Sequence, residues 1–464
     1  LAAAGKPVIV LTVGASEASQ AAARSHTGAL TSATDVVAAA CAAAGAVLVE
    51  TPAQAVDVAH LLLDSPMPRG RRVAVVSDSG GQGALAADAL VRAGLAVPRL
   101  SSRTAAALAE LLPTADAVSN PLDLAGAGEQ DLSTYGRVVE WLLRSDEVDT
   151  VVLSGYFGTY GVDTPELADR EMDVVDTLAD AVRSHARPVV VHSLSHDSPA
   201  VRSMRAKSVP ALHTIDGVAR SLALAVQLST ERRAGGAAGD VLPSEATAGT
   251  SVGYLAARDL VASYGVRYPR GRAIDSVADL RAAIVDLEPP YVLKAAWLEH
   301  KTELGGVVVS LADPAAAEAA LTEMTERLGR GTYVVEEMDT GSDVVELIVG
   351  ARRDPCFGPV VMVGLGGVHA ELYRDTRLAL APVTEADALR MIQSLRAYPL
   401  LRGWRGRPAV DVDAAAAVVA GVSRLLAEQP GVAECEVNPL RVGPTGALAV
   451  DALVLAADAA AKGR

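Results

Sequence analysis

VAVVSDSGGQG, residues 73–83, is a short apolar run that passes into a glycine-rich turn. The apolar run does not alternate with polar residues, which is typical of a strand buried on both faces of a parallel sheet. The alanine-rich segment Gly83–Ala93 follows with helical spacing. The stretch therefore predicts a strand, a tight turn and a helix, the repeating unit of a sheet that is covered by helices.

The same unit recurs on both sides of this stretch. Valine-rich runs bounded by turn residues occur at Val8–Val13, Val47–Glu50, Thr150–Gly155 and Pro188–Ser193. Segments with helical spacing lie between them, as at Asp35–Ala44 and Asp173–His185. The alternation predicts parallel α/β architecture up to residue 228. The Pro/Gly/Arg segment Pro66–Arg72 divides it into two predicted domains, residues 1–66 and 67–228.

A polar segment without apolar periodicity, Thr230–Thr250, predicts a flexible linker, which we place at residues 229–249. Beyond it the pattern predicts helices at Tyr254–Tyr264, Val277–Val285 and Pro314–Arg327. Strands are predicted at Tyr291–Ala295, Gly306–Leu311, Tyr333–Met338 and Asp343–Ala351, and a hairpin is predicted from Glu434–Val437 and Ala447–Val450 around the turn GPTG. This mixture predicts an α+β domain over residues 250–457.

The composition limits the possible functions. Of 464 residues, 50% are hydrophobic but only 3% are aromatic, so alanine, valine and leucine must build the cores. The formal net charge of −15 argues against a nucleic-acid partner, whose phosphates would be repelled. No apolar run reaches the ~18 residues of a membrane span, so we expect no membrane partner.

The cysteines and the first residues of the chain bear on the cellular compartment. Cys41, Cys356 and Cys435 lie far apart without CxxC spacing, so we expect small core residues in a reducing, cytoplasmic setting. A strand-like run follows Leu1 almost at once, without a charged segment before it. This does not resemble a signal peptide, and we expect the natural protein to begin further upstream.

The loop RSHTGAL, residues 24–30, places His26 among small residues just before a predicted helix. An imidazole in an open loop is substantially neutral at physiological pH, so its ring nitrogen can accept a phosphoryl group. A loop histidine with only a structural hydrogen bond would give the same pattern. Spacing alone leaves both interpretations open.

The turn SDSGGQG, residues 77–83, opens the helix of the first unit. Backbone N–H groups of Gly80, Gly81 and Gly83, together with the helix dipole, would form an anion site. A tight strand-to-helix connection without a ligand is the alternative. The polar turn SNPLDL, residues 119–124, has no chemistry that its spacing assigns.

Lys294 lies on a predicted buried strand and is followed by the pair Gly305-Gly306. A buried lysine needs an anionic partner, which a phosphate would supply, and a glycine pair lets a loop fold closely over phosphates. Four further residues can contact the base and ribose of a nucleotide. They lie at the end of one predicted strand and on the next, and they are Glu336, Glu337, Met338 and Glu346. Each of these carboxylates alone would more often be simply exposed.

Asn438 and Asp451 lie on opposite sides of the predicted hairpin, where antiparallel pairing can bring them together. An amide oxygen and a carboxylate oxygen are hard ligands that suit Mg²⁺, which takes its other ligands from water and phosphates. A turn-stabilising asparagine before Pro439 is the alternative.

Together these motifs resemble those of the ADP-forming (NDP-forming) acyl-CoA synthetases, relatives of succinyl-CoA synthetase. The matching motifs, in the order of that family, are SHTGAL (25–30), SDSGGQG (77–83), SNPLDL (119–124), HKTELGGV (300–307), DPCFGPVVMVGLGG (354–367) and EVNPL (436–440). The resemblance covers nearly the whole chain. It implies two flavodoxin-like parallel-sheet ligase domains, the first of them partial, followed by an α+β ATP-grasp domain. The CoA-binding domain of the family is expected to precede Leu1.

The resemblance also implies an activity. It is that of an acid–thiol ligase, which makes acyl-CoA from a carboxylic acid, CoA and ATP through an acyl-phosphate, with ADP and phosphate as products. His26 would be the phosphorylated histidine, and His300 would carry the phosphoryl group between it and the nucleotide. The implied ATP-lining residues are Lys294, Gly305, Gly306, Glu336, Glu337, Met338 and Glu346, and the implied Mg²⁺ ligands are Asn438 and Asp451. Homo-oligomers are typical of the family, so we expect one here.

Two positions depart from the family pattern. Where the family often has arginine, this chain has Ala379, with Arg377 two residues earlier. Residues i and i−2 of a strand share a face, so we expect Arg377 to substitute. A glutamate that is common near the start of the ATP-grasp domain is replaced by Ala256.

Two other classes of protein fit part of the pattern. A ligase-like region can be the regulatory scaffold of a protein acetyltransferase, but the loop histidine is commonly lost there, whereas His26 is present. A nucleotide sensor without catalysis would have no need of phosphoryl carriers such as His26 and His300.

Overall fold

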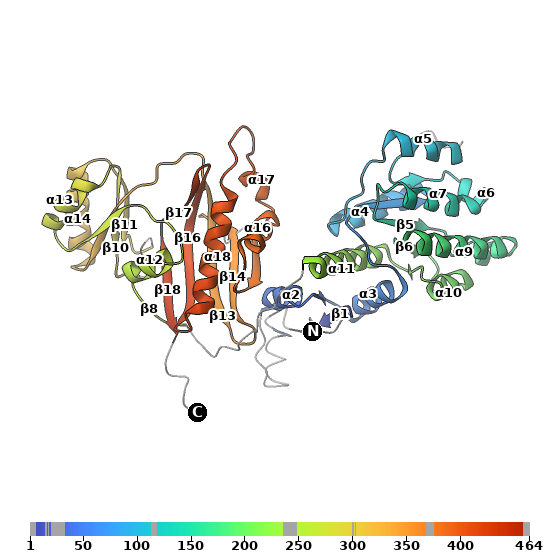
Figure 1. Cartoon of the computed structure of the whole chain (residues 1–464), viewed down its shortest axis with the longest axis horizontal. Helices are drawn as coiled ribbons and strands as arrows, with labels where there is room; N and C mark the ends of the chain where they lie inside the picture. Colours follow the sequence, from blue (N-terminus) through green and yellow to red (C-terminus); the bar gives the residue numbers. More distant parts are fainter. Residues whose placement is uncertain are drawn as a thin grey trace, which may run out of the picture. The chain divides into compact units, whose positions relative to one another are not determined.

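The computed structural model describes residues 6–13, 16, 18–19, 33–112, 118–234, 248–298, 301, 303–367 and 375–457. Contacts divide the chain into two compact units, which are coloured along the sequence in Figure 1. Unit 1 contains residues 1–13 and 41–238, and unit 2 contains residues 14–40 and 239–464. Within the described residues, no helix has the length and apolar character needed to cross a bilayer.

Unit 1 is built around a five-stranded parallel sheet with strand order β4-β3-β5-β6-β7. The strands are β3 (Val73–Ser77), β4 (Leu122–Asp123), β5 (Thr150–Gly155), β6 (Val189–Ser193) and β7 (Ala211–Leu212). The helices are α4 (Gly80–Arg92), α5 (Ser102–Leu111), α6 (Ala127–Gln130), α7 (Ser133–Arg144), α8 (Tyr160–Asp163), η2 (Pro165–Leu167), α9 (Ala168–His185), α10 (Pro199–Ala206) and α11 (Ile215–Ala234). The predicted parallel α/β fold is confirmed.

Strand β3 shows why the apolar run does not alternate. Val73 and Val75 pack against α4 and α11 on one face, while Ala74 and Val76 pack against α5, α7 and α9 on the other. Both faces are therefore buried, and every residue of the strand must be small or apolar. The strand order also reverses beside β3, because the chain goes from β3 to β4 on one side and then to β5 on the other. Such a reversal opens a crevice at the carboxyl ends of the strands.

A second, two-stranded parallel sheet pairs β1 (Val8–Leu11) with β2 (Ala46–Val49), which are connected to α2 (Thr34–Ala43) and α3 (Pro52–Asp64). Val47 and Val49 pack with Val58 of α3 and Leu228 of α11. Helix α11 thus contacts elements from both of the segments 1–66 and 67–228. It also continues to Ala234, so the first residues of the expected linker are helical, and the partition into domains stays a prediction.

Unit 2 contains two antiparallel sheets. A four-stranded sheet has the order β11-β10-β12-β9, and a larger sheet has the order β15-β14-β13-β16-β18-β8, with β17 paired to β16. The strands are β8 (Ala248–Ser251), β9 (Gly271–Ile274), β10 (Tyr291–Ala295), β11 (Val307–Leu311), β12 (Tyr333–Glu337), β13 (Val345–Asp354), β14 (Gly358–Leu365), β15 (Thr376–Leu380), β16 (Val432–Gly443), β17 (Gly446–Ala449) and β18 (Ala452–Ala457). The predicted α+β character is confirmed.

Helices cover one face of each sheet. They are α12 (Tyr254–Ala262), α13 (Val277–Ala283), η3 (Ile284–Asp286), α14 (Pro314–Leu328), α16 (Glu385–Gln393), α17 (Tyr398–Leu401) and α18 (Val412–Glu428). Leu280 of α13 and Leu321 of α14 pack on the four-stranded sheet. Helix α18 lies along β13, β14 and β16 of the larger sheet, as Figure 1 shows. Its Val419 and Val422 pack into that core.

The expectation for the cysteines is partly wrong. Cys41 and Cys435 are buried, but Cys356 is exposed. Cys356 lies in the turn that joins β13 to β14, where its backbone N–H donates to Asp354 Oδ1 at 2.9 Å. A turn at the end of a hairpin leaves the sheet, so the side chain cannot reach the core.

Candidate functional site

A cavity of about 310 Å³ lies in unit 2, and we call it the Lys294 cavity. Strands β10, β11 and β12 contribute one part of its lining, and β13, β16 and the β17–β18 connection contribute the rest. The lining residues are Pro269, Val292, Lys294, Val307, Val309, Glu336, Glu337, Met338, Asp339, Glu346, Asn438, Pro439, Arg441, Val450 and Asp451. Seven of these fifteen residues are charged and most of the others are apolar, so the cavity suits a polar small molecule that also has an apolar part.

Lys294 is 5% exposed and Glu336 is 1% exposed, so both are buried charges. On paired strands β10 and β12, Lys294 lies opposite Val334 and Glu336 lies opposite Val292. The two are therefore diagonal neighbours on one face, and Lys294 Nζ lies 2.6 Å from Glu336 Oε2. The anion that a buried lysine requires is thus supplied by the protein itself.

Glu336 has further donors, and Lys294 has further acceptors. Tyr254 donates its hydroxyl to Glu336 Oε1 at 2.7 Å, and Arg258 NH1 lies 2.6 Å from the same oxygen. Lys294 Nζ also lies 3.1 Å from the Tyr254 hydroxyl and donates to the carbonyl oxygen of Val450. The network links helix α12, strands β10 and β12, and the β17–β18 connection around one cavity.

Tyr254 lies between two lysines. The ammonium of Lys294 is 4.9 Å from its ring centroid, and that of Lys301 is 4.7 Å from it. Burial and the neighbouring carboxylate of Glu336 raise the pKa of Tyr254 far above its ordinary value. The phenol therefore stays protonated and acts as a hydrogen-bond donor, while its ring face attracts both cations.

Lys301 is a second buried cation of this site, with 5% of its surface exposed. Its Nζ lies 3.1 Å from Asp451 Oδ1. The same carboxylate oxygen accepts the backbone N–H of Ala452 at 2.9 Å. Sequence reasoning did not single out Lys301, although its place in the motif HKTELGGV was visible.

Glu346 and Asp339 share one arginine. Arg441 NH1 lies 3.0 Å from Glu346 Oε1, and Arg441 Nε lies 2.8 Å from Asp339 Oδ2. Burial alone would raise the pKa of Asp339, but its hydrogen bonds with Arg441 and the N–H of Gly341 hold that pKa below its ordinary value. Sequence reasoning missed Arg441 and Asp339, because their contact depends on strand β16 returning beside β13.

Glu337 and Met338 lie where β12 leaves the sheet. Glu337 Oε1 lies 3.1 Å from Arg270 NH1 and accepts the N–H of Glu288 at 3.1 Å. Met338 donates its backbone N–H to the carbonyl oxygen of Pro290 at 2.8 Å. Both residues line the cavity, and the contacts fix the direction in which the chain leaves the strand.

Asn438 and Asp451 lie side by side, as the hairpin pattern predicts. The backbone N–H of Asn438 donates to the carbonyl oxygen of Asp451 at 3.4 Å. Strand β16 pairs with β18 up to Val437 and with β17 from Leu440, so the two residues lie where the pairing changes from one strand to the other. Asn438 uses its amide nitrogen to contact Glu436 Oε1 at 3.2 Å, and its oxygen remains available as a ligand.

The donor set suits a hard divalent cation such as Mg²⁺. Asp451 already contacts one cation, the Lys301 ammonium, and Asn438 adds an amide oxygen. Within the part of the chain that the structure describes, no group of three or more His, Cys, Asp and Glu residues gathers in a metal-binding arrangement. A metal here would therefore need further ligands from water and phosphates, as Mg²⁺ ordinarily does.

A second cavity, of about 370 Å³, lies in unit 1 at the start of helix α4. Gly80 and Gly83 line it together with Asp123 and Pro121, so the motifs SDSGGQG and SNPLDL meet there. Gly81 follows Gly80 in the first turn of the helix, whose cap residue Ser79 makes no side-chain hydrogen bond to it. The first N–H groups of α4 are therefore not capped by a side chain, as an anion site requires.

Gly80 and Gly81 differ in the space around them. A Cβ on Gly80 would lie 2.8 Å from Asp123 Oδ2, whereas a Cβ on Gly81 would meet nothing closer than Ser79 Oγ at 4.0 Å. A side chain on Gly80 would therefore require the exposed Asp123 carboxylate to shift, whereas one on Gly81 would not. The cavity lies at the carboxyl ends of β3 and β4, beside the reversal of strand order, where ligands of open α/β sheets commonly bind.

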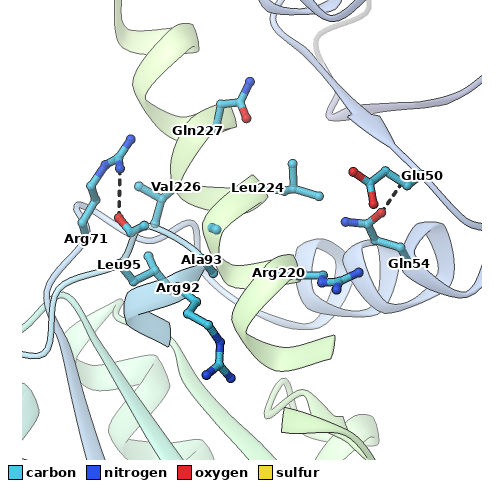
Figure 2. A pocket seen from close by; sticks show the side chains of 12 residues that line it. Glu50, Gln54, Arg71, Arg92, Ala93, Leu95, Arg220, Leu224, Val226 and Gln227 are labelled. Atoms are coloured by element: carbon cyan, nitrogen blue, oxygen red, sulfur yellow. Dashed lines mark hydrogen bonds between the residues drawn. The ribbon is translucent and has the colours of Figure 1, made fainter. Parts of the chain in front are cut away.

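A larger cavity, of about 530 Å³, lies between α3, α11 and the end of α4 in unit 1. Arg71, Arg92 and Arg220 are among its lining residues. Figure 2 shows that the guanidinium groups of Arg71 and Arg92 point in opposite directions, and Arg71 NH1 is bound to the carbonyl oxygen of Gly94 at 2.9 Å. The three cations do not converge on one anion, so this hollow is not assigned a ligand.

Three segments of the chain match families of known proteins. Family models match residues 1–62 (succinyl-CoA ligase like flavodoxin domain), residues 73–215 (ligase-CoA domain) and residues 246–455 (ATP-grasp domain). The β subunit of ADP-forming acetate–CoA ligase I from Pyrococcus furiosus is 32% identical over 209 residues, which are 43% of this chain and 89% of that protein. The chain belongs to the ADP-forming acetate–CoA ligase family.

Other relatives of this ligase family match nearly the whole chain. A trans-feruloyl-CoA synthase from an unknown prokaryotic organism is 29% identical over 98% of the chain, and ADP-forming acetate–CoA ligase I from Archaeoglobus fulgidus is 29% identical over 96%. The chain spans 65% of the length of each of these two proteins. A solved structure of acetyl-coenzyme A synthetase 1 from Ca. Korarchaeum cryptofilum in complex with coenzyme A is 34% identical, with 44% of this chain and 93% of that chain covered and a TM-score of 0.42.

Several residues expected in this ligase family's sites are placed elsewhere or not described. His26 and His300 lie outside the described residues. Gly305 and Gly306 are not among the residues that line the Lys294 cavity. The carbonyl oxygen of Gly305 accepts a hydrogen bond from Arg327 at 2.6 Å, and that of Gly306 pairs with the N–H of Ala295 at 2.8 Å. The roles of all four stay predictions.

Arg377, expected to replace the family's arginine at position 379, is held by helix α16. Its Nε lies 3.0 Å from Ser394 Oγ, and NH2 donates to the carbonyl oxygen of Ser394. Arg377 and Ala379 are both on β15, two residues apart and hence on one face. Its NH1 also donates to the carbonyl oxygen of Thr376 at 2.7 Å and lies 3.6 Å from Asp375 Oδ1, so the described contacts of Arg377 are with the end of α16 and its own strand rather than with the cavity.

Proposed function

We propose that this protein catalyses the ATP-dependent formation of acyl-CoA from a carboxylic acid and CoA, with ADP and phosphate as products, in a reaction that is reversible. The proposal is supported most by the Lys294 cavity, which is lined by a buried lysine, by a carboxylate beside an amide, and by apolar side chains. A second buried lysine, Lys301, contacts the Asp451 carboxylate of this lining. The family and the order of its motifs support the same activity.

In the proposed reaction the Lys294 cavity holds the nucleotide. Lys294 would exchange its ion pair with Glu336 for a contact with a phosphate oxygen. Three apolar side chains of the lining would contact the base: Val292, Val307 and Met338. Glu337 and Glu346 are the proposed partners of the polar edges of base and ribose. Asp451 and Asn438 would hold Mg²⁺, which when bound would neutralise charge on the transferred phosphoryl group.

The phosphoryl group would then move in three transfers, to His300, to His26 and to the acid, and each of them forms one bond to phosphorus and breaks the previous one. A ring nitrogen of His300 attacks the γ-phosphorus, a P–N bond forms, and the P–O bond to ADP breaks. The group next passes to His26, which delivers it to the carboxylate of the acid, so that an acyl-phosphate forms and the P–N bond breaks. The sulfur of CoA finally attacks the acyl carbon and releases phosphate. Two separate sites cannot share one transition state, which is the reason for a covalent carrier.

The start of α4 is the proposed place where the phosphoryl group carried by His26 is stabilised. The uncapped N–H groups at Gly80 and Gly81 and the dipole of a 13-residue helix favour a negative charge there. Gly83 lies beside Pro121, and a Cβ there would be in ordinary contact with the proline at 3.4 Å.

The test is phosphorylation of the protein by γ-labelled ATP with Mg²⁺, followed by measurement of acid-labile label. We expect label on His300 and His26 in the wild-type protein, none in His300→Ala, and label on His300 only in His26→Ala. A protein that binds ATP but takes no label would contradict the proposal and favour a nucleotide sensor. Label without CoA-dependent phosphate release for any of a panel of carboxylic acids would contradict the ligase step.

A further inference from the structure

Lys301 forms an ion pair with Asp451, the carboxylate that the proposed function assigns to the metal. Its ammonium lies 3.1 Å from Asp451 Oδ1 and 4.7 Å from the centroid of the Tyr254 ring, and Asp451 lines the Lys294 cavity. Lys301 is almost completely buried, whereas the Asp451 side chain is 30% exposed. The Lys301 ammonium is therefore buried behind Asp451, whereas the Asp451 carboxylate remains accessible from the cavity.

A second cation on this carboxylate would meet strong repulsion. A divalent ion bound to Asp451 would lie within a few ångström of the Lys301 ammonium, and charges in a partly buried site are poorly screened. The single negative charge of Asp451 cannot neutralise both the Lys301 ammonium and a divalent ion, so we expect the two cations to compete for it. One of the two cations must lose its contact with Asp451.

Displaced Lys301 needs a new anion. Among the described residues, Asp451 is the only carboxylate within ion-pair distance of its ammonium. Lys294 differs in this respect, because Glu336 stays beside it at 2.6 Å. A buried ammonium without an anion is strongly unfavourable, so free metal alone cannot displace Lys301 at little cost. A polyphosphate brings the missing negative charge into the same cavity.

We propose that Lys301 is an internal cation that keeps free divalent metal off Asp451, so that metal enters only together with the polyphosphate of a nucleotide, which then binds Lys301. The proposal deepens the proposed function and rests on it in one respect, the role of Asp451 as a metal ligand. The metal and the nucleotide then bind as one unit, with Lys301 changing its anionic partner from carboxylate to phosphate.

The test measures Mn²⁺ binding by the paramagnetic resonance signal of free Mn²⁺, with no turnover required. Without nucleotide, we expect Lys301→Met to bind Mn²⁺ at least tenfold more tightly than the wild-type protein. Lys301→Arg keeps the charge and should bind within about twofold of wild type. With a non-hydrolysable ATP analogue, the advantage of Lys301→Met should disappear, because the wild-type lysine has then moved to the phosphates. If Lys301→Met does not fold, Lys301→Gln provides the same comparison.

Two controls separate this effect from general electrostatics. Lys207→Met makes the same change of net charge and frees Asp176 from an exposed ion pair in unit 1, so it should leave Mn²⁺ binding unchanged. The double variant Lys301→Met/Asp451→Asn should lose the gain. An equal gain in Lys207→Met, or no gain in Lys301→Met, would overturn the proposal.

The failure of the proposed function has a different signature. If Asp451→Asn alone leaves Mn²⁺ binding with the nucleotide analogue unchanged, Asp451 is not the metal ligand, and the assignment of the metal site itself is wrong. If Asp451→Asn weakens that binding at least tenfold but Lys301→Met gives no gain without nucleotide, the metal assignment stands and only the role of Lys301 fails.

Discussion

At the scale of single residues, Glu336 receives three donors and is nearly inaccessible to solvent. Glu336→Gln would leave the ammonium of Lys294 and the guanidinium of Arg258 buried without their counter-charge. Breaking a buried ion pair by removing one partner typically costs about 3–5 kcal/mol. We expect a loss of this order in the opening free energy of the four-stranded sheet, measured by native-state hydrogen exchange of the amides in β10 and β12.

Glu337 provides the matched control on the neighbouring position. Its partner Arg270 has a side chain that is 63% exposed, and exposed ion pairs contribute only about 0–1 kcal/mol. Glu337→Gln should therefore change the same exchange rates little. Equal effects of the two substitutions would show that the buried network does not stabilise this sheet.

The residue scale also shows how far the sequence predicts the site. The pairing of Asn438 with Asp451 follows from one local hairpin and is confirmed. Lys294 was predicted to lie on a buried strand, which is confirmed, but the expected anion was a phosphate, whereas the anion beside it is Glu336. Its role in ATP binding stays a prediction. The identity of that anion, Glu336, depends on the register of β10 against β12, which are 42 residues apart at this contact and cannot be aligned from local pattern. Arg441 and Lys301 were missed because their partners are also distant in the sequence: Arg441 reaches Glu346 through the pairing of β16 with β13, and Lys301 contacts Asp451.

At the scale of elements, the start of α4 gives a sharp comparison between two neighbouring glycines. Gly80→Ala would place a methyl group 2.8 Å from Asp123 Oδ2, so the first turn of the helix or the carboxylate must shift. Gly81→Ala has free space. We expect Gly80→Ala to lower the yield of label on His26 about tenfold and Gly81→Ala to leave it within about twofold, measured by acid-labile incorporation from γ-labelled ATP. Equal yields would remove this turn from the phosphoryl path.

The beginnings of β3 and β5 are joined by one ion pair with a defined pH dependence. Arg72 donates its Nε to Asp149 Oδ2 at 3.1 Å and NH2 to Oδ1 at 2.8 Å. Burial alone would raise the pKa of Asp149, but the bidentate Arg72 and its backbone N–H hold that pKa below the ordinary value. A lowered pKa in the folded state means stability that is present above the ordinary pKa of aspartate and is lost as the pH falls through the lowered one.

Asp149→Asn should therefore lower the stability of unit 1 at pH 7 by about 1.5–3 kcal/mol, the usual contribution of hydrogen bonds to a charged group. The difference between variant and wild type should shrink below about pH 4, where Asp149 becomes protonated in the unfolded chain and then in the native one. Urea unfolding at both pH values, followed by the fluorescence of Trp141, measures it. A difference that does not change with pH would contradict the ion-pair explanation.

Helices and strands were predicted best where the hydrophobic pattern of the segment itself determines its structure. The strand Val73–Ser77 agrees with its predicted bounds, and Pro314–Leu328 extends the predicted helix by one residue. Strand β8 was missed because Ala248–Ser251 is small and polar and gains its place only by pairing with β18. Strand β9 was missed for a similar reason, since most of Gly271–Ile274 is exposed and its order comes from β12.

At the scale of the whole molecule, every residue that lines the Lys294 cavity lies between Pro269 and Asp451. The two cores that support it are also formed by residues 257–454. We therefore expect a fragment of residues 246–464 to fold and to bind a non-hydrolysable ATP analogue within about threefold of the intact protein. Calorimetric titration measures it, and a fragment that folds but does not bind would show that unit 1 contributes to the nucleotide site.

The ring of Tyr254 lies close to two ammonium groups, so a spectroscopic probe on this ring can report their movement. A fluorine atom introduced at the meta position of this ring would experience the fields of Lys294 and Lys301 from a short distance. The departure of either cation would shift the resonance of that nucleus. A series of ¹⁹F spectra recorded during a ligand titration, compared with those of Lys301→Met, would thus report when the pocket exchanges its internal charges for those of a ligand.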